Sequence, residues 1–84
     1  SPTIAGSVDT DGYARGVAIS GNYAYVADYS KGLKIIDISN PTSPKIVGSV
    51  DIDNALDVAI SGNYAYVANS EKGLKIIDIS NPTS

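Results

Sequence analysis

The chain has 84 residues, a net charge of −3 at pH 7, and neither Cys nor His. These absences exclude disulfides, thiolate chemistry and zinc sites, so association is the remaining source of extra stability for so small a domain. The six Lys and Arg residues are scattered, which disfavours nucleic-acid binding, and no apolar run approaches the roughly 18 residues of a membrane-spanning helix.

The amino terminus lacks the basic and apolar regions of a signal peptide, so we expect none, and the sequence leaves the localisation of this soluble chain undetermined. All six aromatic residues are Tyr, and His, Met, Phe, Trp, Cys and Gln are absent. Such a restricted set of residue types indicates an idealised or designed repeat.

Short apolar segments separated by turn residues predict an all-β chain. Val and Ile dominate the apolar residues, and no segment shows a helical period. Gly21-Asn22 suits a two-residue hairpin turn because both residues tolerate positive φ, and residues 39–44 form a turn cluster with two prolines. In chain order, the first strands that we expect are Thr3–Asp9, Arg15–Ser20, Tyr23–Asp28, Leu33–Ile38 and Lys45–Asp51.

The chain contains an internal repeat. Residues 2–9 recur as residues 44–51 with 6 of 8 positions identical, and residues 17–43 recur as residues 58–84 with 24 of 27 identical. The offset of 41 to 42 residues falls in the range of β-propeller blades, and four strands joined by short hairpins make one blade. We therefore expect propeller repeat 1 at residues 1–42, with an outer strand plus the first three strands of a blade, and propeller repeat 2 at residues 43–84.

The third strand of each repeat carries the segment LKIID, at residues 33–37 and 74–78. With the flanking segments GVAISGNYAYVAD and GLKIIDISNP, it makes the sequence resemble the LVIVD-repeat β-propellers over essentially the whole chain. The resemblance implies four-stranded propeller blades but no single activity, because these repeats are scaffolds. The chain departs from natural, multi-repeat members in carrying two repeats that are unusually alike.

Two blades cannot close a propeller, which needs roughly 4–8 blades, so two apolar faces stay open and predict a homo-oligomer. A tetramer would have eight blades and a trimer six; the resemblance favours the homotetramer over the homotrimer. We expect residues 16–20 to be innermost and residues 45–51 outermost, which leaves the last blade without its fourth strand. Thr3–Asp9 of one protomer would then pair with Leu74–Ile79 of the next and cover an exposed edge.

The loops between the fourth strand of one blade and the first strand of the next differ most between the repeats. We expect these loops to surround one mouth of the central channel, where rings of Asp suit a cation such as Ca²⁺ and a ring of Arg suits an anion. The alternative is that the charges are solvated, with the arginine paired to a neighbouring Asp. The candidate binding residues are Asp11, Tyr13, Arg15, Asp53, Asn54 and Asp57.

Asp37 and Asp78 interrupt third strands that are otherwise largely apolar. They would be acids or metal ligands in a functional interpretation. Because every blade repeats this Asp, we expect a structural role instead. The carboxylate would accept hydrogen bonds from backbone amides of the following Ser-Asn-Pro turn or from a hydroxyl of the next blade.

The sequence gives little support to catalysis. There is no His base, no Cys nucleophile and no phosphate-binding loop, and nothing in the spacing selects a carboxylate pair for glycoside hydrolysis. We expect a self-assembling structural scaffold, engineered from a propeller blade, with no catalytic activity, no metal and no cofactor. The alternative is a module that binds a ligand, an ion or a protein at the mouth of the channel.

Overall fold

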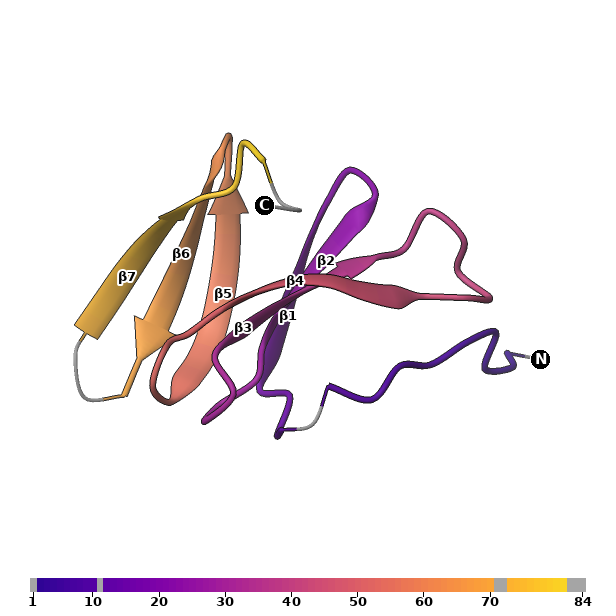
Figure 1. The fold of residues 1–84 in the computed structure, drawn as a ribbon, viewed down its shortest axis with the longest axis horizontal. Helices are drawn as coiled ribbons and strands as arrows, with labels where there is room; N and C mark the ends of the chain where they lie inside the picture. The colour runs from indigo at the N-terminus through magenta and orange to yellow at the C-terminus, as the bar shows by residue number, and fades with distance from the viewer. Residues whose placement is uncertain (1, 11, 71–72, 82–84) are drawn as a thin grey trace.

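The computed structural model describes residues 2–10, 12–70 and 73–81, which form two antiparallel β-sheets and, within these ranges, no helix (Figure 1). The first sheet has four strands in the order β1-β2-β3-β4, and the second has three in the order β5-β6-β7. The all-β prediction is therefore confirmed, and consecutive antiparallel strands are the arrangement of a propeller blade. The strands are β1 (Gly16–Ser20), β2 (Tyr23–Ala27), β3 (Leu33–Asp37), β4 (Lys45–Val50), β5 (Ala55–Ser61), β6 (Tyr64–Asn69) and β7 (Gly73–Asp78).

The hairpins β1–β2 and β5–β6 turn on the dipeptides Gly21-Asn22 and Gly62-Asn63. Gly21 and Gly62 both have φ of 59°, whereas neither asparagine has positive φ. Positive φ at the first central position alone is the pattern of a type II′ turn, whose twist matches that of the flanking strands. The turn thus uses the conformational freedom of glycine and not the tolerance of asparagine.

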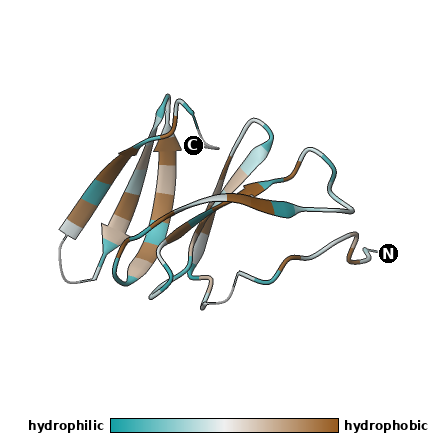
Figure 2. Ribbon diagram, in the orientation of Figure 1, coloured by the Kyte–Doolittle hydropathy of each residue, from teal (hydrophilic) through white to brown (hydrophobic). Residues whose placement is uncertain are grey.

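The two sheets pack face to face around one apolar core. Apolar residues follow the strands of both sheets, and hydrophilic residues lie mostly at the turns (Figure 2). A backbone bridge also joins the sheets, because Tyr29 and Ala55 exchange two N–H to carbonyl hydrogen bonds of 3.0 and 2.9 Å. The buried core residues come from both sheets: Tyr25, Ala27, Leu33, Ile35, Ile52, Ala55, Val58, Ala65, Val67 and Ile79.

A second, smaller apolar cluster lies on the opposite face of the first sheet. Ala24, Val26 and Ile36 are buried there, with Ile38 packed against them. Because successive residues of a strand point to opposite faces, these side chains alternate with the core residues of β2 and β3. The first sheet is therefore apolar on both faces, which is typical of a sheet that packs against neighbours on both sides.

Residues 2–10 lie outside both sheets. The segment at residues 3–9, which we expect to be an outer strand, forms no strand within this single chain. It runs beside the turn at residues 41–44, where the Gly6 backbone closely approaches the Pro41 carbonyl oxygen, and it lies on the opposite side of the molecule from β7 (Figure 1). Ile4 in this segment is 90% exposed.

The first sheet combines strands from both sequence repeats, whereas the second sheet uses strands of one repeat. The first sheet takes β1, β2 and β3 from residues 1–42 and β4 from residues 43–84. The second sheet takes β5, β6 and β7 from residues 43–84, and no strand follows β7 in the described part of the chain. The second sheet therefore has three of the four strands of a blade.

Candidate functional site

The outer edge of the second sheet is the most distinctive surface of the chain. In the first sheet, Leu33 and Ile35 of β3 are 0% and 4% exposed. The equivalent residues of β7, Leu74 and Ile76, are 59% and 60% exposed, and they lie on the face turned away from the first sheet. Identical side chains in one strand motif thus differ in burial because β7 lacks the neighbours that surround β3.

Two equivalent glycines, one before β3 and one at the start of β7, have different surroundings. Gly32 precedes β3 with φ of 80°, and a Cβ there would overlap the Val50 carbonyl oxygen at the end of β4. Gly73 holds the equivalent position in β7 with φ of 84°, and a Cβ there would meet no atom within 4 Å. Gly73 therefore shares the backbone conformation of Gly32, although no described strand lies beside β7 where β4 lies beside β3.

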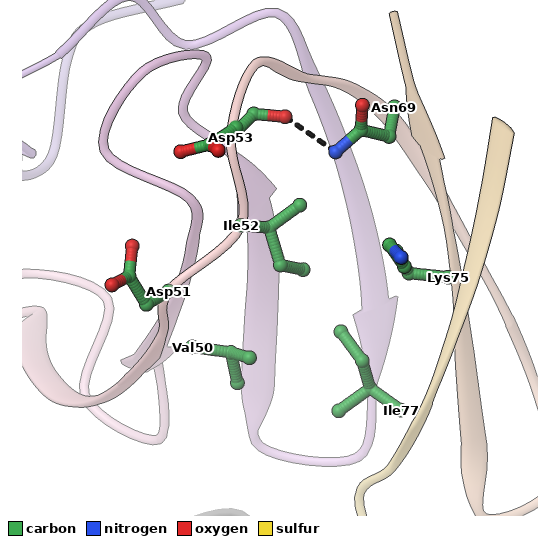
Figure 3. Close-up of a pocket in the computed structure, with 7 residues that line it drawn as sticks. All are labelled: Val50, Asp51, Ile52, Asp53, Asn69, Lys75 and Ile77. Atoms are coloured by element: carbon green, nitrogen blue, oxygen red, sulfur yellow. Dashed lines mark hydrogen bonds between the residues drawn. The ribbon is translucent and has the colours of Figure 1, made fainter. Parts of the chain in front are cut away.

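A hollow of about 360 Å³ adjoins β7 on the face toward the first sheet (Figure 3). The Asn69 side-chain amide donates a 2.5 Å hydrogen bond to the Asp53 carbonyl oxygen at one end. Lys75, Asp51 and Asp53 also line this space. The lining residues are Val50, Asp51, Ile52, Asp53, Asn69, Lys75 and Ile77.

The outward face of the first sheet is also partly open. Val17 and Ile19 of β1 are 61% and 58% exposed. At the equivalent positions of β5, Val58 is buried and Ile60 is half-buried against the core between the sheets. Val17 and Ile19 are thus exposed at positions whose equivalents in the other sheet are covered, whereas Ala24, Val26 and Ile36 of the same face are buried.

A buried carboxyl group lies where the amino-terminal segment meets the loop after β2. Asp28 is 0% exposed, and its Oδ1 accepts a 2.8 Å hydrogen bond from the Thr10 hydroxyl. Its Oδ2 has no hydrogen-bond partner among the described residues. In the second repeat this position holds Asn69, which places an amide donor where the first repeat has a second carboxyl oxygen.

The loop before β1 contains a cation–aromatic pair. The guanidinium carbon of Arg15 lies 5.2 Å from the centre of the Tyr29 ring. Tyr13 is 74% exposed, and Gly12, Tyr13, Ala14 and Arg15 line an open hollow of about 440 Å³. Tyr13 and Arg15 belong to the predicted binding residues. Tyr29 stands out in the sequence as a candidate for surface contacts, because the other repeat has Ser70 at the equivalent position.

The remaining predicted binding residues do not converge on that hollow. Asp53 borders the hollow beside β7, and Asn54 has φ of 57° in the turn before β5. Asp57 accepts a 2.9 Å hydrogen bond from the Val58 N–H and lies against Gly16 of β1, between the two sheets. Asp11 lies outside the described residues. Among the described residues of the predicted set, Tyr13 and Arg15 thus line one hollow together.

The structural role predicted for the aspartates of the third strands is confirmed. The backbone N–H groups of Ser39 and Ser80 donate 2.9 Å hydrogen bonds to Asp37 Oδ1 and Asp78 Oδ1. These backbone hydrogen bonds lower the pKa of both carboxyl groups below the ordinary value of 3.8. Hydrogen bonds from the side chains of the same serines lower the pKa further, with a smaller effect. Each carboxylate fixes the turn that follows its strand.

The described residues contain no group of three or more Asp or Glu side chains that could hold a metal ion. In the same part of the chain, no helix is long and apolar enough to cross a membrane.

Comparison with protein families gives two matches of the LVIVD repeat, at residues 11–52 and 53–84. Comparison with curated proteins and with solved structures gives no match. The family matches span most of the chain, and each begins in the loop that leads into the first strand of a sheet, β1 or β5. With its two antiparallel sheets in blade order, the chain belongs to the LVIVD-repeat family.

Proposed function

We propose that this chain is a self-assembling structural scaffold, in which copies join head to tail to close a β-propeller. One observation carries the proposal: the two open faces repeat the two halves of the interface inside the chain. Tyr25, Leu33 and Ile35 pack against the second sheet, and the second sheet presents the same residue types on its own outward face. A surface that buries its partner once inside the chain is complementary to the same partner in a second copy.

The correspondence holds for both halves of the interface. On one half, the first sheet buries Ala18, Tyr25, Ala27, Leu33 and Ile35, and the second sheet leaves open Ala59, Tyr66, Ala68, Leu74 and Ile76. On the other half, the second sheet packs Val58, Ile60, Ala65, Val67 and Ile77 against the first, whose outward face carries Val17, Ile19, Ala24, Val26 and Ile36.

Donation of the amino-terminal segment completes the second blade in this proposal. Residues 4 and 6–8 are identical to residues 46 and 48–50 of β4. In the β3–β4 pair, Lys34 lies opposite Ser49 and Ile36 lies opposite Ile46. If residues 3–8 of a neighbouring copy pair with β7 in the same register, Ser7 lies opposite Lys75 and Ile4 lies opposite Ile77.

Three features of the single chain support this pairing. Ile4 is 90% exposed and gains an apolar neighbour only in the assembly. It would share the face of Ile77, and that face borders the 360 Å³ hollow beside β7. Gly73 has open space where Gly32 meets the carbonyl of Val50, and the Val8 carbonyl of the neighbour would fill that space. Pairing also covers the exposed edge of β7.

We favour a homotetramer with eight blades, on the resemblance to the family, and a homotrimer with six blades is the alternative. Both lie in the range of about 4–8 blades that propellers use. We further propose that the chain is engineered and has no catalytic activity. The near identity of the repeats and the restricted set of residue types support this part of the proposal.

Engineered cross-links test the assembly, since the chain has no cysteine of its own. Ser7→Cys and Lys75→Cys are placed in one chain, oxidised, and run on a denaturing gel without reductant. The expected product is a covalent series of chains up to the size of the ring, because the two cysteines face each other between neighbouring copies.

Two matched variants control the cross-linking. Lys34→Cys with Ser49→Cys occupies the same register inside one chain, and it should form a disulfide without joining chains. Ser7→Cys with Ile77→Cys moves one cysteine two positions along β7 and should cross-link far less. If the Lys34/Ser49 control oxidises while the Ser7/Lys75 variant stays as single chains, strand donation is wrong.

A further inference from the structure

We propose that Arg15, Tyr29 and Tyr13 form a binding site for an aromatic carboxylate. The three residues belong to one chain, so this site goes beyond the scaffold function and does not depend on the assembly. It gives a location and a chemical class of ligand to the binding function that the sequence leaves as an alternative.

Arg15 supplies the anion-binding group. Its guanidinium carbon stands 5.2 Å from the centre of the Tyr29 ring, within the roughly 6 Å of a cation–π contact. Its backbone N–H donates a 2.7 Å hydrogen bond to the Ala27 carbonyl, which fixes the residue at the start of β1. A guanidinium group carries N–H donors in a planar fork, which binds both oxygens of a carboxylate.

Tyr29 is held in place by its backbone. Its φ of 49° lies in the left-handed region, which bulky residues rarely adopt. Both its N–H and its carbonyl are bonded to Ala55 of the second sheet. An unusual conformation maintained by the surrounding structure is typical of functional positions, and the Arg15 guanidinium carbon lies over the ring of this residue.

The site is open, because the side chains of both Tyr13 and Arg15 are exposed. The adjoining hollow of about 440 Å³ lies in the size range of small-molecule pockets, roughly 300–1,000 Å³. The Tyr13 side chain at its border is 74% exposed and offers an aromatic face to the ring of a ligand.

The scaffold itself does not require these residues. The second repeat has Leu56, Ser70 and Asn54 where the first has Arg15, Tyr29 and Tyr13. It nevertheless forms the same β-hairpins in the same register. The cation, the aromatic ring beneath it and the exposed aromatic ring beside it are thus confined to one repeat, whereas 24 of 27 positions from β1 onward are shared.

Nuclear magnetic resonance on the full chain tests the site, because Arg15 is the only arginine and gives a single Nε–Hε signal. Titration with benzoate should move this signal along a saturating curve in the millimolar range. Acetate carries the charge without the ring, and benzyl alcohol carries the ring without the charge. Each should bind at least about tenfold more weakly than benzoate, since each makes one of the two contacts.

The matched variants take their residues from the second repeat. Signals of Tyr13 and of neighbouring backbone amides report binding when the arginine is absent. Arg15→Leu should abolish benzoate binding. Tyr29→Ser should weaken binding about tenfold because the guanidinium group loses the ring that holds it in place. Arg15→Lys, which keeps the charge but removes the planar fork of N–H donors, should also weaken binding about tenfold. The proposal is overturned if Arg15→Leu binds benzoate as wild type does, or if acetate or benzyl alcohol binds as tightly as benzoate.

Discussion

Leu33 and Leu74 occupy the same position in two nearly identical strands, yet one side chain is fully buried and the other is 59% exposed. Leu33 packs in the core between the two sheets, whereas Leu74 lies on the outward face of the second sheet. This difference connects the sequence repeat to the proposed assembly, because only a further blade would give Leu74 the surroundings of Leu33.

Alanine at these two positions separates the single chain from the assembly. Leu33→Ala should lower the free energy of unfolding by about 2–5 kcal/mol, the usual effect of truncating a buried leucine. In the assembled protein, Leu74→Ala should lower the free energy of unfolding by a comparable amount. If the chain stays alone, the same substitution should change the free energy of unfolding by no more than about 0.5 kcal/mol. Urea denaturation at a concentration where the wild type is assembled measures both, and a negligible cost for Leu74→Ala under those conditions contradicts the packing proposed here.

Asp28→Asn should stabilise the protein. The fully buried carboxyl of Asp28 has one oxygen without a hydrogen-bond partner in the described part of the chain, and Asn69 shows that the fold accommodates an amide at this position. Relief of a buried unsatisfied group is worth about 1–3 kcal/mol. Chemical denaturation of Asp28→Asn and of the reciprocal Asn69→Asp should show opposite changes, and a loss of stability in Asp28→Asn would count against this account.

Acid should remove the stabilisation that Asp37 and Asp78 provide. The amides of Ser39 and Ser80 lower the pKa of these carboxyl groups in the folded protein below the ordinary value of 3.8. A group with a lowered pKa in the folded state stabilises at pH values above its unfolded pKa, and this contribution disappears as the pH falls through the folded pKa.

Melting temperatures measured from neutral pH to about pH 2 test this expectation. The double variant Asp37→Ala/Asp78→Ala should melt below the wild type at neutral pH, and the two curves should converge in acid. A difference between the two proteins that stays constant down to the lowest pH would show that the carboxylate charge does not contribute.

The strands of the first sheet were predictable because alternating apolar residues and turn dipeptides are local signals. Residues 23–28 were expected as a strand, and β2 spans Tyr23–Ala27. The bonds from Ser39 and Ser80 to the preceding aspartates were likewise predictable, since each partner lies two residues away.

The features that sequence reasoning missed depend on contacts between distant segments. In the sequence, Asp28 is the polar last residue of a predicted strand. In the structure, the amino-terminal segment and the loop after β2 bury its side chain. Tyr29 adopts positive φ because its backbone bridges to Ala55, 26 positions further along the chain. Residues 3–9 carry the pattern of an outer strand, yet a strand also needs a partner, and within one chain β4 already occupies the edge of β3.

The mass of the particle in solution tests the central claim most directly. The chain has a mass of 8.7 kDa, so light scattering should give 34.8 kDa for four chains, or 26.1 kDa for three. Either value would support closure of a ring by identical copies and would give its number of blades. A mass of 8.7 kDa at every concentration would contradict the assembly and leave the open faces of both sheets without the partner proposed for them.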